Sequence, residues 1–210
     1  MNWDWIRSNI PALMDATVDH VFLTAIAVGV GFAISLVFAL VIHRDRRFYG
    51  PLAGFSGVVY TIPSLALLAF LVPFTGLSIL TAEIALVGYT LLILTRSIVG
   101  GLDAVPREIT EAADGMGYSW AERLMKVDLP LAVPLIIAGL RVATVTTIGL
   151  VMVTALIGEG GLGQLMLRGF NFRNTTAVYT GAVITVALAV VVDLALVGLG
   201  RLATPWTRRR

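Results

Sequence analysis

The chain contains no cysteine among its 210 residues, and only 13% of its residues are charged. The absence of cysteine excludes a disulfide framework and thiolate chemistry. Hydrophobic residues make up 58% of the sequence, and the mean hydropathy is +0.91. Soluble domains are about half apolar and about a quarter charged, so a water-soluble protein of this length could not hide this much apolar surface. The composition predicts a polytopic membrane protein in which residues 1–210 form a single domain.

Features of nucleotide-, metal- and nucleic-acid-binding proteins are also missing. The sequence has no G-x-x-x-x-G-K-[ST] loop, and its only lysine, Lys126, lacks the glycines that cradle a phosphate. We therefore expect no ATPase activity, no catalytic residue and no cofactor bound by this chain. His20 and His43 have no partners at metal-ligand spacing, which predicts no metal site. The pI near 9.3 does not indicate nucleic-acid binding, because the basic residues cluster at the ends of apolar segments.

The apolar segments predict an all-α membrane protein, since a helical span needs about 20 apolar residues. Pro63 falls inside the second span and should kink it, whereas Pro73, Gly76 and Ser78 mark the turn before the third. Residues 158–176 are expected to form a glycine-rich loop. The five expected transmembrane helices lie at residues 21–42, 52–72, 79–99, 130–157 and 177–200.

The distribution of Lys and Arg predicts the orientation of the spans. The loop at Arg44, the segment around Lys126 and the three arginines that end the chain fall on one side of the membrane. The opposite side holds only Arg7, Arg168 and Arg173. We therefore expect the N-terminus outside, the C-terminus in the cytoplasm and the polar segment between spans three and four in the cytoplasm.

This polar segment, residues 103–129, predicts a short helix that begins near Asp103. Asp103 can cap the helix, and Pro106 can occupy its first turn, where a missing N–H does no harm. Gly115 and Gly117 can end the helix, because glycine readily adopts the left-handed conformation. Helical spacing places five apolar residues on one stripe: Val105, Ile109, Ala112, Ala113 and Met116.

A second short helix should follow in the same segment. Ser119-Trp120-Ala121-Glu122 is a capping-box pattern, and Pro130 then restarts the chain into the membrane. An amphipathic helix lying on the membrane surface would be rich in Lys and Arg on its polar face, but this segment is acidic, and an anionic leaflet repels acidic helices. The segment therefore suits a cleft on a protein partner better than a lipid surface.

One pattern in this segment carries a family resemblance. It begins with Glu-Ala-Ala, followed after any three residues by Gly. After any nine further residues comes an aliphatic residue, then any one residue and Leu-Pro. It resembles the docking motif of ABC-importer permeases, with valine at the position where isoleucine is usual, and the resemblance extends from about Val18 to Arg201. Residues 103–129 would then be the coupling region, which contains short coupling helices that contact an ATPase. The motif residues are Glu111, Ala112, Ala113, Gly117, Val127, Leu129 and Pro130.

The resemblance implies a larger assembly in the cytoplasmic membrane of a bacterium or archaeon. Its other parts would be a cytoplasmic ABC ATPase dimer that holds ATP and Mg, a second permease subunit and an extracytoplasmic substrate-binding protein. The second permease could be an identical copy or a related chain. ATP binding would close the ATPases, pull the coupling helices together and turn the permeases from inward-facing to outward-facing.

Two further stretches resemble the osmoprotectant permeases, which import glycine betaine, choline or carnitine. One runs from Thr61 to Leu68 and is followed by Val72-Pro73-Phe74, and the other runs from Ala155 to Gly163. Methionine permeases carry similar glycines, so import of methionine or another small amino-acid-like solute remains an alternative. An ATPase-independent channel or secondary carrier is an alternative from a different class. Expected gate or pathway residues are Thr61, Pro63, Ser64, Gly160, Gly161 and Gly163.

Two charged residues fall inside the last two spans. Arg141 is 11 residues after Pro130, and Asp193 is eight residues before Arg201, which places both at a similar depth. We expect an intramembrane ion pair, either between spans four and five or across a subunit interface. Glu83, near one end of the third span, is expected at the membrane interface. The spans show no evident aromatic cluster to hold a quaternary ammonium cation, so the high-affinity substrate site should lie in the binding protein.

Overall fold

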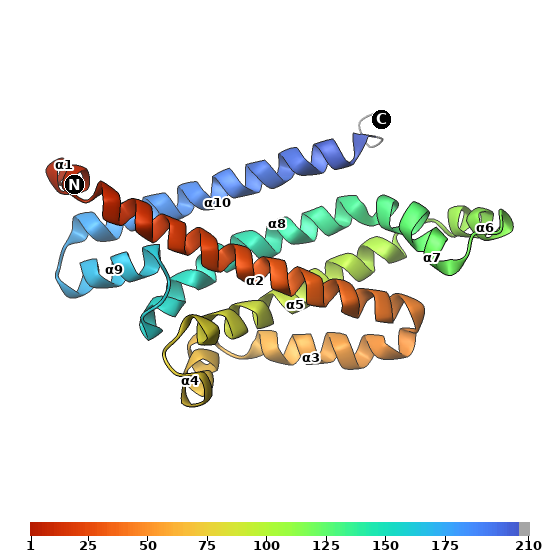
Figure 1. Cartoon of the computed structure of the whole chain (residues 1–210), viewed down its shortest axis with the longest axis horizontal. Helices are drawn as coiled ribbons and strands as arrows, with labels where there is room; N and C mark the ends of the chain where they lie inside the picture. The colour runs from red at the N-terminus through yellow and green to blue at the C-terminus, as the bar shows by residue number, and fades with distance from the viewer. Residues whose placement is uncertain (206–210) are drawn as a thin grey trace.

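The computed structural model describes residues 1–205, and all regular secondary structure in that range is helical. The long helices are α2 (Ile10–Arg44), α5 (Ile79–Asp103), α8 (Leu129–Thr154) and α10 (Thr175–Ala203). The shorter helices are α1 (Trp3–Ser8), α3 (Tyr49–Thr61), α4 (Ser64–Thr75), α6 (Arg107–Gly115), α7 (Trp120–Arg123) and α9 (Leu162–Asn171). Short 3-10 turns occupy Arg46–Phe48 and Ala155–Ile157, and a π-helical turn occupies Leu124–Asp128. The long helices form an elongated bundle with α6 and α7 at one end and α1 and α9 at the other (Figure 1).

The number of apolar helices agrees with an all-α membrane protein. Four helical stretches in residues 1–205 are long and apolar enough to cross a membrane, and the bent pair of α3 and α4 brings the total to five if it forms one span. Helices α2, α5 and α10 are longer than the expected spans: α2 begins at Ile10 rather than near residue 21, and α5 continues to Asp103. Hydropathy locates the apolar layer, whereas backbone hydrogen bonding can carry a helix beyond that layer.

The second expected span is broken rather than kinked. The two helices on either side of Ile62 and Pro63 meet at an angle of 98°. Proline disfavours the helical conformation of the residue before it, and Ile62 is extended, with φ −68° and ψ 128°. The Tyr89 hydroxyl on α5 donates a hydrogen bond to the carbonyl freed at Ile62. The expected turn before α5 is present, with Gly76 at φ +73° and Ser78 capping the helix, but Pro73 lies inside α4 rather than in the turn.

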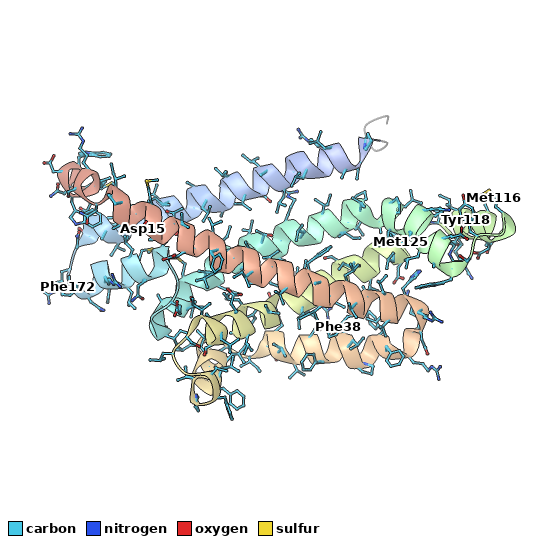
Figure 2. All side chains as sticks on the ribbon, viewed as in Figure 1. Asp15, Phe38, Met116, Tyr118, Met125 and Phe172 are labelled. Atoms are coloured by element: carbon cyan, nitrogen blue, oxygen red, sulfur yellow. The ribbon has the colours of Figure 1, made fainter. Side chains whose placement is uncertain are left out.

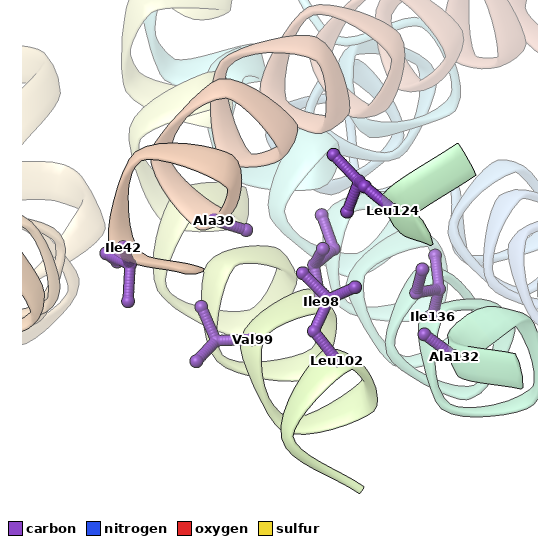
Figure 3. Packing of buried hydrophobic residues seen from close by; sticks show 8 residues of the cluster. All are labelled: Ala39, Ile42, Ile98, Val99, Leu102, Leu124, Ala132 and Ile136. Atoms are coloured by element: carbon purple, nitrogen blue, oxygen red, sulfur yellow. The ribbon is translucent and has the colours of Figure 1, made fainter. Parts of the chain in front are cut away.

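The largest buried cluster joins α2, α5 and α8 near the end of the bundle that carries α6 and α7. Figure 3 shows Ala39 and Ile42 of α2 on one side of the α5 residues Val99 and Ile98, and Ala132 and Ile136 of α8 on the other. Small residues allow the helices to approach closely. A Cβ atom added at Gly31 of α2 would lie 1.8 Å from the Thr90 Oγ1 atom of α5. The remaining members of the cluster are Ile98, Val99, Leu102, Leu124, Ala132 and Ile136.

The segment expected as a glycine-rich loop contains a helix, α9, at Leu162–Asn171. Its glycines permit close packing: a Cβ atom at Gly163 would lie 2.7 Å from the Met152 carbonyl oxygen, and one at Gly169 would lie 2.8 Å from Ala177 Cβ. The loop expectation was wrong here because glycine indicates either a turn or a close contact, and the sequence does not distinguish the two. The three arginines that end the chain lie outside the described residues.

Candidate functional site

The coupling region projects from one end of the bundle between α5 and α8. Figure 2 shows Met116, Tyr118 and Met125 at this end, far from Asp15 and Phe172 at the other. The region begins later than expected, because α5 runs to Asp103 and Pro106 is the N-cap of α6. Asp103 therefore ends α5 and pairs with Arg46 instead of capping the next helix. The signal for an N-cap was present, but tertiary packing extended the preceding helix through it.

The end of α6 depends on Gly117, as expected. Its φ is +84°, a conformation that favours glycine. The backbone N–H of Gly117 donates to the Asp114 carbonyl at 2.9 Å, and that of Tyr118 donates to the Ala113 carbonyl at 3.2 Å. These bonds satisfy carbonyls that the end of a helix would otherwise leave free. They turn the chain sharply, so that α7 can lie beside α6.

The apolar stripe expected on α6 is divided between the protein interior and the surface. Ala113 is 1% exposed and packs against the rest of the chain, and Val105 before the helix is also buried. Ile109 is 41% exposed and Met116 is 68% exposed. Glu111 and Ala112 are also exposed. This helix therefore presents apolar and acidic side chains outward.

The expected capping box at the start of α7 is present. The Glu122 carboxylate accepts hydrogen bonds from the Ser119 backbone N–H at 3.0 Å and from its hydroxyl at 2.9 Å. Pro130 does not restart the helix, because the chain is helical without a break from Trp120 to Ile157. A π-helical turn precedes the proline, and such a turn is a known way to accommodate a disturbed hydrogen-bond ladder. Val127 is half-buried in this turn, and Leu129 packs against the core cluster.

An ionic network ties the two short helices together. The Arg123 Nη1 atom lies 2.6 Å from Asp114 Oδ2 at the end of α6. The Nε atom of the same arginine lies 3.3 Å from Asp128 Oδ2, and the Asp128 side chain is only 1% exposed. His43 Nε2, at the end of α2, lies 3.4 Å from the same carboxylate oxygen. Arg123 therefore links α6 to the π-helical turn, and His43 places the end of α2 beside the same carboxylate. The sequence analysis did not predict that these residues lie together, because their spacings match no local pattern.

Ring contacts strengthen the link between α2 and α7. The ring centroids of His43 and Trp120 are 6.3 Å apart, and the Arg44 guanidinium lies 5.4 Å from the centroid of the Trp120 ring. A cation over an aromatic face contributes about 0.5–1 kcal/mol at exposed sites. Beside them, hydrogen bonds from the Arg47 side chain and backbone hold the pKa of Asp45 below its ordinary value. Charged and aromatic groups at this end thus fix the coupling region to its neighbours.

The expected gate residues of the second span lie at the break between α3 and α4. Thr61 ends α3 and donates a hydrogen bond to the Val58 carbonyl at 2.7 Å. Pro63 is exposed, and Ser64 begins α4 and is half-buried. Ser64 faces a small cavity that is also lined by Thr154 of α8.

The expected gate glycines lie elsewhere and are tightly packed. Gly160 has φ +117°, and a Cβ atom there would lie 2.8 Å from the Val151 carbonyl oxygen of α8. Gly161 has φ +50°, and its Cβ would lie 2.4 Å from the Ala16 carbonyl oxygen of α2. With Gly163, which packs on Met152, these glycines anchor the loop to α2 and α8. Thr61, Pro63 and Ser64 therefore lie at the break between α3 and α4, whereas the three glycines pack against α2 and α8.

A cavity of about 610 Å³ opens at the end of the bundle that carries α1 and α9. Asp15, Asp19 and Glu159 line it together with the glycine loop. Glu83, near the start of α5, is 8% exposed, and neither of its carboxylate oxygens has a hydrogen-bond partner among residues 1–205. The same part of the chain contains no group of three or more His, Cys, Asp or Glu residues that could hold a metal ion.

The two intramembrane charges of α8 and α10 contact each other within one chain. Arg141 Nε donates to Asp193 Oδ1 and Arg141 Nη2 donates to Asp193 Oδ2, both at 2.8 Å. The arrangement is a bidentate ion pair, the strongest geometry available to these groups. The side chains are 38% and 28% exposed. They border a groove of about 580 Å³ on the surface of the chain.

Comparisons with known proteins identify the family. Residues 25–208 match the model of the binding-protein-dependent transport system inner membrane component. The chain is 32% identical over 201 residues to the glycine betaine/carnitine/choline transport system permease protein OpuCB of Bacillus subtilis, covering 96% of this chain and 93% of that protein. It is 40% identical over 157 residues to the ergothioneine transport permease/ergothioneine binding protein EgtU of Helicobacter pylori, covering 75% of this chain and 28% of that protein.

Comparison of the folds agrees with the sequence matches. A chain of the MetNI methionine ABC transporter in an inward-facing conformation superposes with a TM-score of 0.86 at 22% identity, covering 94% of this chain and 98% of that chain. At this identity the likeness establishes the fold alone. The sequence matches extend over almost the whole helical bundle, including the coupling region between α5 and α8. This chain belongs to the binding-protein-dependent transport system inner membrane component family, the permease subunits of ABC importers.

Proposed function

We propose that this chain forms the translocation path of an ATP-driven, binding-protein-dependent importer for osmoprotectants such as glycine betaine, choline or carnitine. The observation that carries the substrate class is the match to the glycine betaine/carnitine/choline permease over 96% of this chain. Ergothioneine, named for a second relative, is also a trimethylammonium compound. The substrates named for both relatives therefore share one chemical group, and we extend that group to this chain.

The coupling region supports a docking role. Its outward face carries Ile109, Ala112 and Met116 beside Glu111, and an apolar stripe in contact with water is a feature of protein interfaces. The acidic residues of α6 disfavour contact with an anionic leaflet. We therefore assign this face to the cleft of a cytoplasmic ABC ATPase. The docking motif would act as one unit formed by Glu111, Ala112, Ala113, Gly117, Val127, Leu129 and Pro130.

The chemical work would reside on the partner subunits. An ATPase dimer would bind ATP and Mg, and this chain would carry no enzymatic activity of its own. A second permease subunit and an extracytoplasmic binding protein would complete the importer. The orientation that suits these partners has the coupling region and C-terminus in the cytoplasm and the N-terminus outside, in the cytoplasmic membrane of a bacterium or archaeon.

A movement of the ATPases would displace two helices of the bundle, α8 and α2, at the same time. The coupling region continues directly into α8, and through Asp128 and Trp120 it also contacts the end of α2. Pulling the two coupling helices of a permease pair together would therefore move α8 and α2 as one body. The break at Pro63 and the glycine loop at Gly160, Gly161 and Gly163 are the places where we expect the remaining helices to adjust.

Uptake by proteoliposomes tests this proposal. Vesicles would contain this chain with its ATPase, second permease and binding protein, and uptake of labelled glycine betaine, choline and methionine would be measured with and without ATP. We expect ATP-dependent uptake of a quaternary amine and its loss in the double variant Glu111→Ala/Gly117→Asp. ATP-dependent uptake of methionine alone would replace the substrate class, and uptake without any need for ATPase would support a secondary carrier.

A further inference from the structure

The ion pair of Arg141 and Asp193 lies inside spans but is open to the outside of the chain. Both residues are central in their helices, α8 and α10. Their side chains keep 38% and 28% of their surface exposed in a groove of about 580 Å³. The other walls of the groove are mainly small or apolar and include Val142, Val145 and Val190.

Lipid is an unfavourable neighbour for this groove. A charged side chain at the centre of a bilayer costs at least about 2.5–3.5 kcal/mol, and such residues almost always face a bundle interior or a water-filled cavity. Pairing lowers this cost but does not remove it while a third of each side chain stays uncovered. The exposed side of the pair therefore requires either water or another polar group.

The pair also has unused binding capacity. Its two hydrogen bonds engage Arg141 Nε and Nη2, so the Nη1 N–H groups remain available to a further acceptor. Each Asp193 oxygen accepts one of these bonds and can face a second cation. A molecule with both a carboxylate and a positive charge could therefore bind beside the pair without breaking it, with each charge next to its opposite.

We propose that this groove is a water-filled part of the transport path and that Arg141 and Asp193 form a transient site for a zwitterionic quaternary amine. The ligand carboxylate would accept from the Arg141 guanidinium, and its trimethylammonium group would lie against the Asp193 carboxylate. This inference rests on the proposed function and specifies the substrate chemistry that this chain itself recognises. Choline, which has no carboxylate, would gain only the second contact.

The walls of the groove suit this ligand. A trimethylammonium group has an apolar surface around its charge, and the valines of α8 and α10 provide apolar contact for its methyl groups. The volume falls within the range of small-molecule sites, about 300–1,000 Å³. No aromatic residue lines the groove, so the cage that gives quaternary amines high affinity is missing. Weak binding suits a path, because a transported solute must also leave.

Cysteine accessibility tests whether the groove is wet. The chain contains no cysteine, so Val145→Cys and Val190→Cys would each introduce a single thiol into it. Val58→Cys on α3 is the matched control, because Val58 is 65% exposed and does not line the groove. The complete transporter in proteoliposomes would be treated with a trimethylammonium-bearing methanethiosulfonate. We expect labelling at both groove positions, slowed severalfold by glycine betaine but not by sucrose, and no labelling at position 58.

Two results would overturn the site. One is groove cysteines that stay unlabelled or form disulfides between permease subunits, in complexes that still import solute. The other is labelling that glycine betaine does not slow. If the unsubstituted complex shows no ATP-dependent uptake of any quaternary amine, the proposed function itself fails, and the site fails with it. The uptake measurement therefore separates failure of the site from failure of the function.

Substrate selectivity provides a second test that does not depend on labelling. Arg141→Gln should lower uptake of glycine betaine by about tenfold or more, because it removes a charge-assisted hydrogen bond to the carboxylate. Uptake of choline should fall much less, and Arg141→Lys should restore part of the uptake of betaine. An equal loss of both substrates, in a variant that assembles normally, would assign Arg141 a structural role and contradict the proposal.

Discussion

Replacing Asp128 by Asn removes the carboxylate that both Arg123 and His43 approach. Asp128 is 1% exposed, and its Oδ2 atom lies 3.3 Å from Arg123 Nε and 3.4 Å from His43 Nε2. The amide keeps the shape of the side chain but not its charge. The perturbation therefore acts on the contacts that Asp128 makes with Arg123 and with His43 of α2, with little change in packing.

The size of the effect follows from the geometry. Breaking a buried ion pair by removing one partner costs about 3–5 kcal/mol. Arg123 keeps a second partner, Asp114, at 2.6 Å, and both contacts of Asp128 are long, so we expect a smaller loss of about 2 kcal/mol. This loss corresponds to about a 30-fold increase in local opening of residues 120–128. The pair of Asp103 and Arg46 at the same end is 38% and 58% exposed, and such pairs contribute about 0–1 kcal/mol.

Hydrogen–deuterium exchange measures this opening directly. Backbone amides of residues 120–128 should exchange about 30-fold faster in Asp128→Asn. The matched variant Asp103→Asn should change the same amides by less than about fivefold. Equal exchange in the two variants, or no change in Asp128→Asn, would refute the idea that this buried carboxylate holds the coupling region to α2.

Two further substitutions probe the packing and the docking face. Gly161→Ala would place a Cβ atom 2.4 and 2.6 Å from two backbone atoms of α2 at a φ of +50°, so we expect a loss of at least about 3 kcal/mol and a clearly lower thermal midpoint. Gly149→Ala, with nothing within 4 Å of the added atom, should leave that midpoint unchanged, and equal midpoints would contradict the packing argument. Met116→Asp, at a position 68% exposed, should abolish copurification of the ATPase without lowering the midpoint. Phe172→Asp, at a position 83% exposed at the other end, should retain the ATPase, and retention by both variants would argue against docking on α6.

Short sequence patterns predicted the short helices and turns correctly where the stabilising hydrogen bonds join residues close together in the sequence. The capping box of Ser119 and Glu122 needs only four residues, and it is present. The left-handed Gly117 and the turn at Gly76 and Ser78 also follow from the conformational preferences of a few adjacent residues. Hydropathy located the apolar helices because membrane burial depends on composition averaged over about 20 residues.

Non-local interactions explain what the sequence did not predict. Asp103 had the residue type of an N-cap, but the packing of α5 extends that helix through it. Pro63 indicated a kink, whereas the hydrogen bond from Tyr89 to the Ile62 carbonyl helps to support a complete break of 98°. Glu83 is buried although it is charged, and no local pattern marks it. The network around Asp128 joins residues from α2, α6 and the π-helical turn, so only the folded chain brings it together.

The most direct test of the account is photo-crosslinking from the two ends of the bundle. A photoreactive amino acid would replace Met116 in one variant and Phe172 in the other, two exposed positions at opposite ends (Figure 2). In the assembled importer, the probe at position 116 should capture the ATPase subunit, and the probe at position 172 should not. Capture of the ATPase from position 172 would reverse the proposed orientation, and its capture from neither position would contradict the claim that this coupling region links import to ATP.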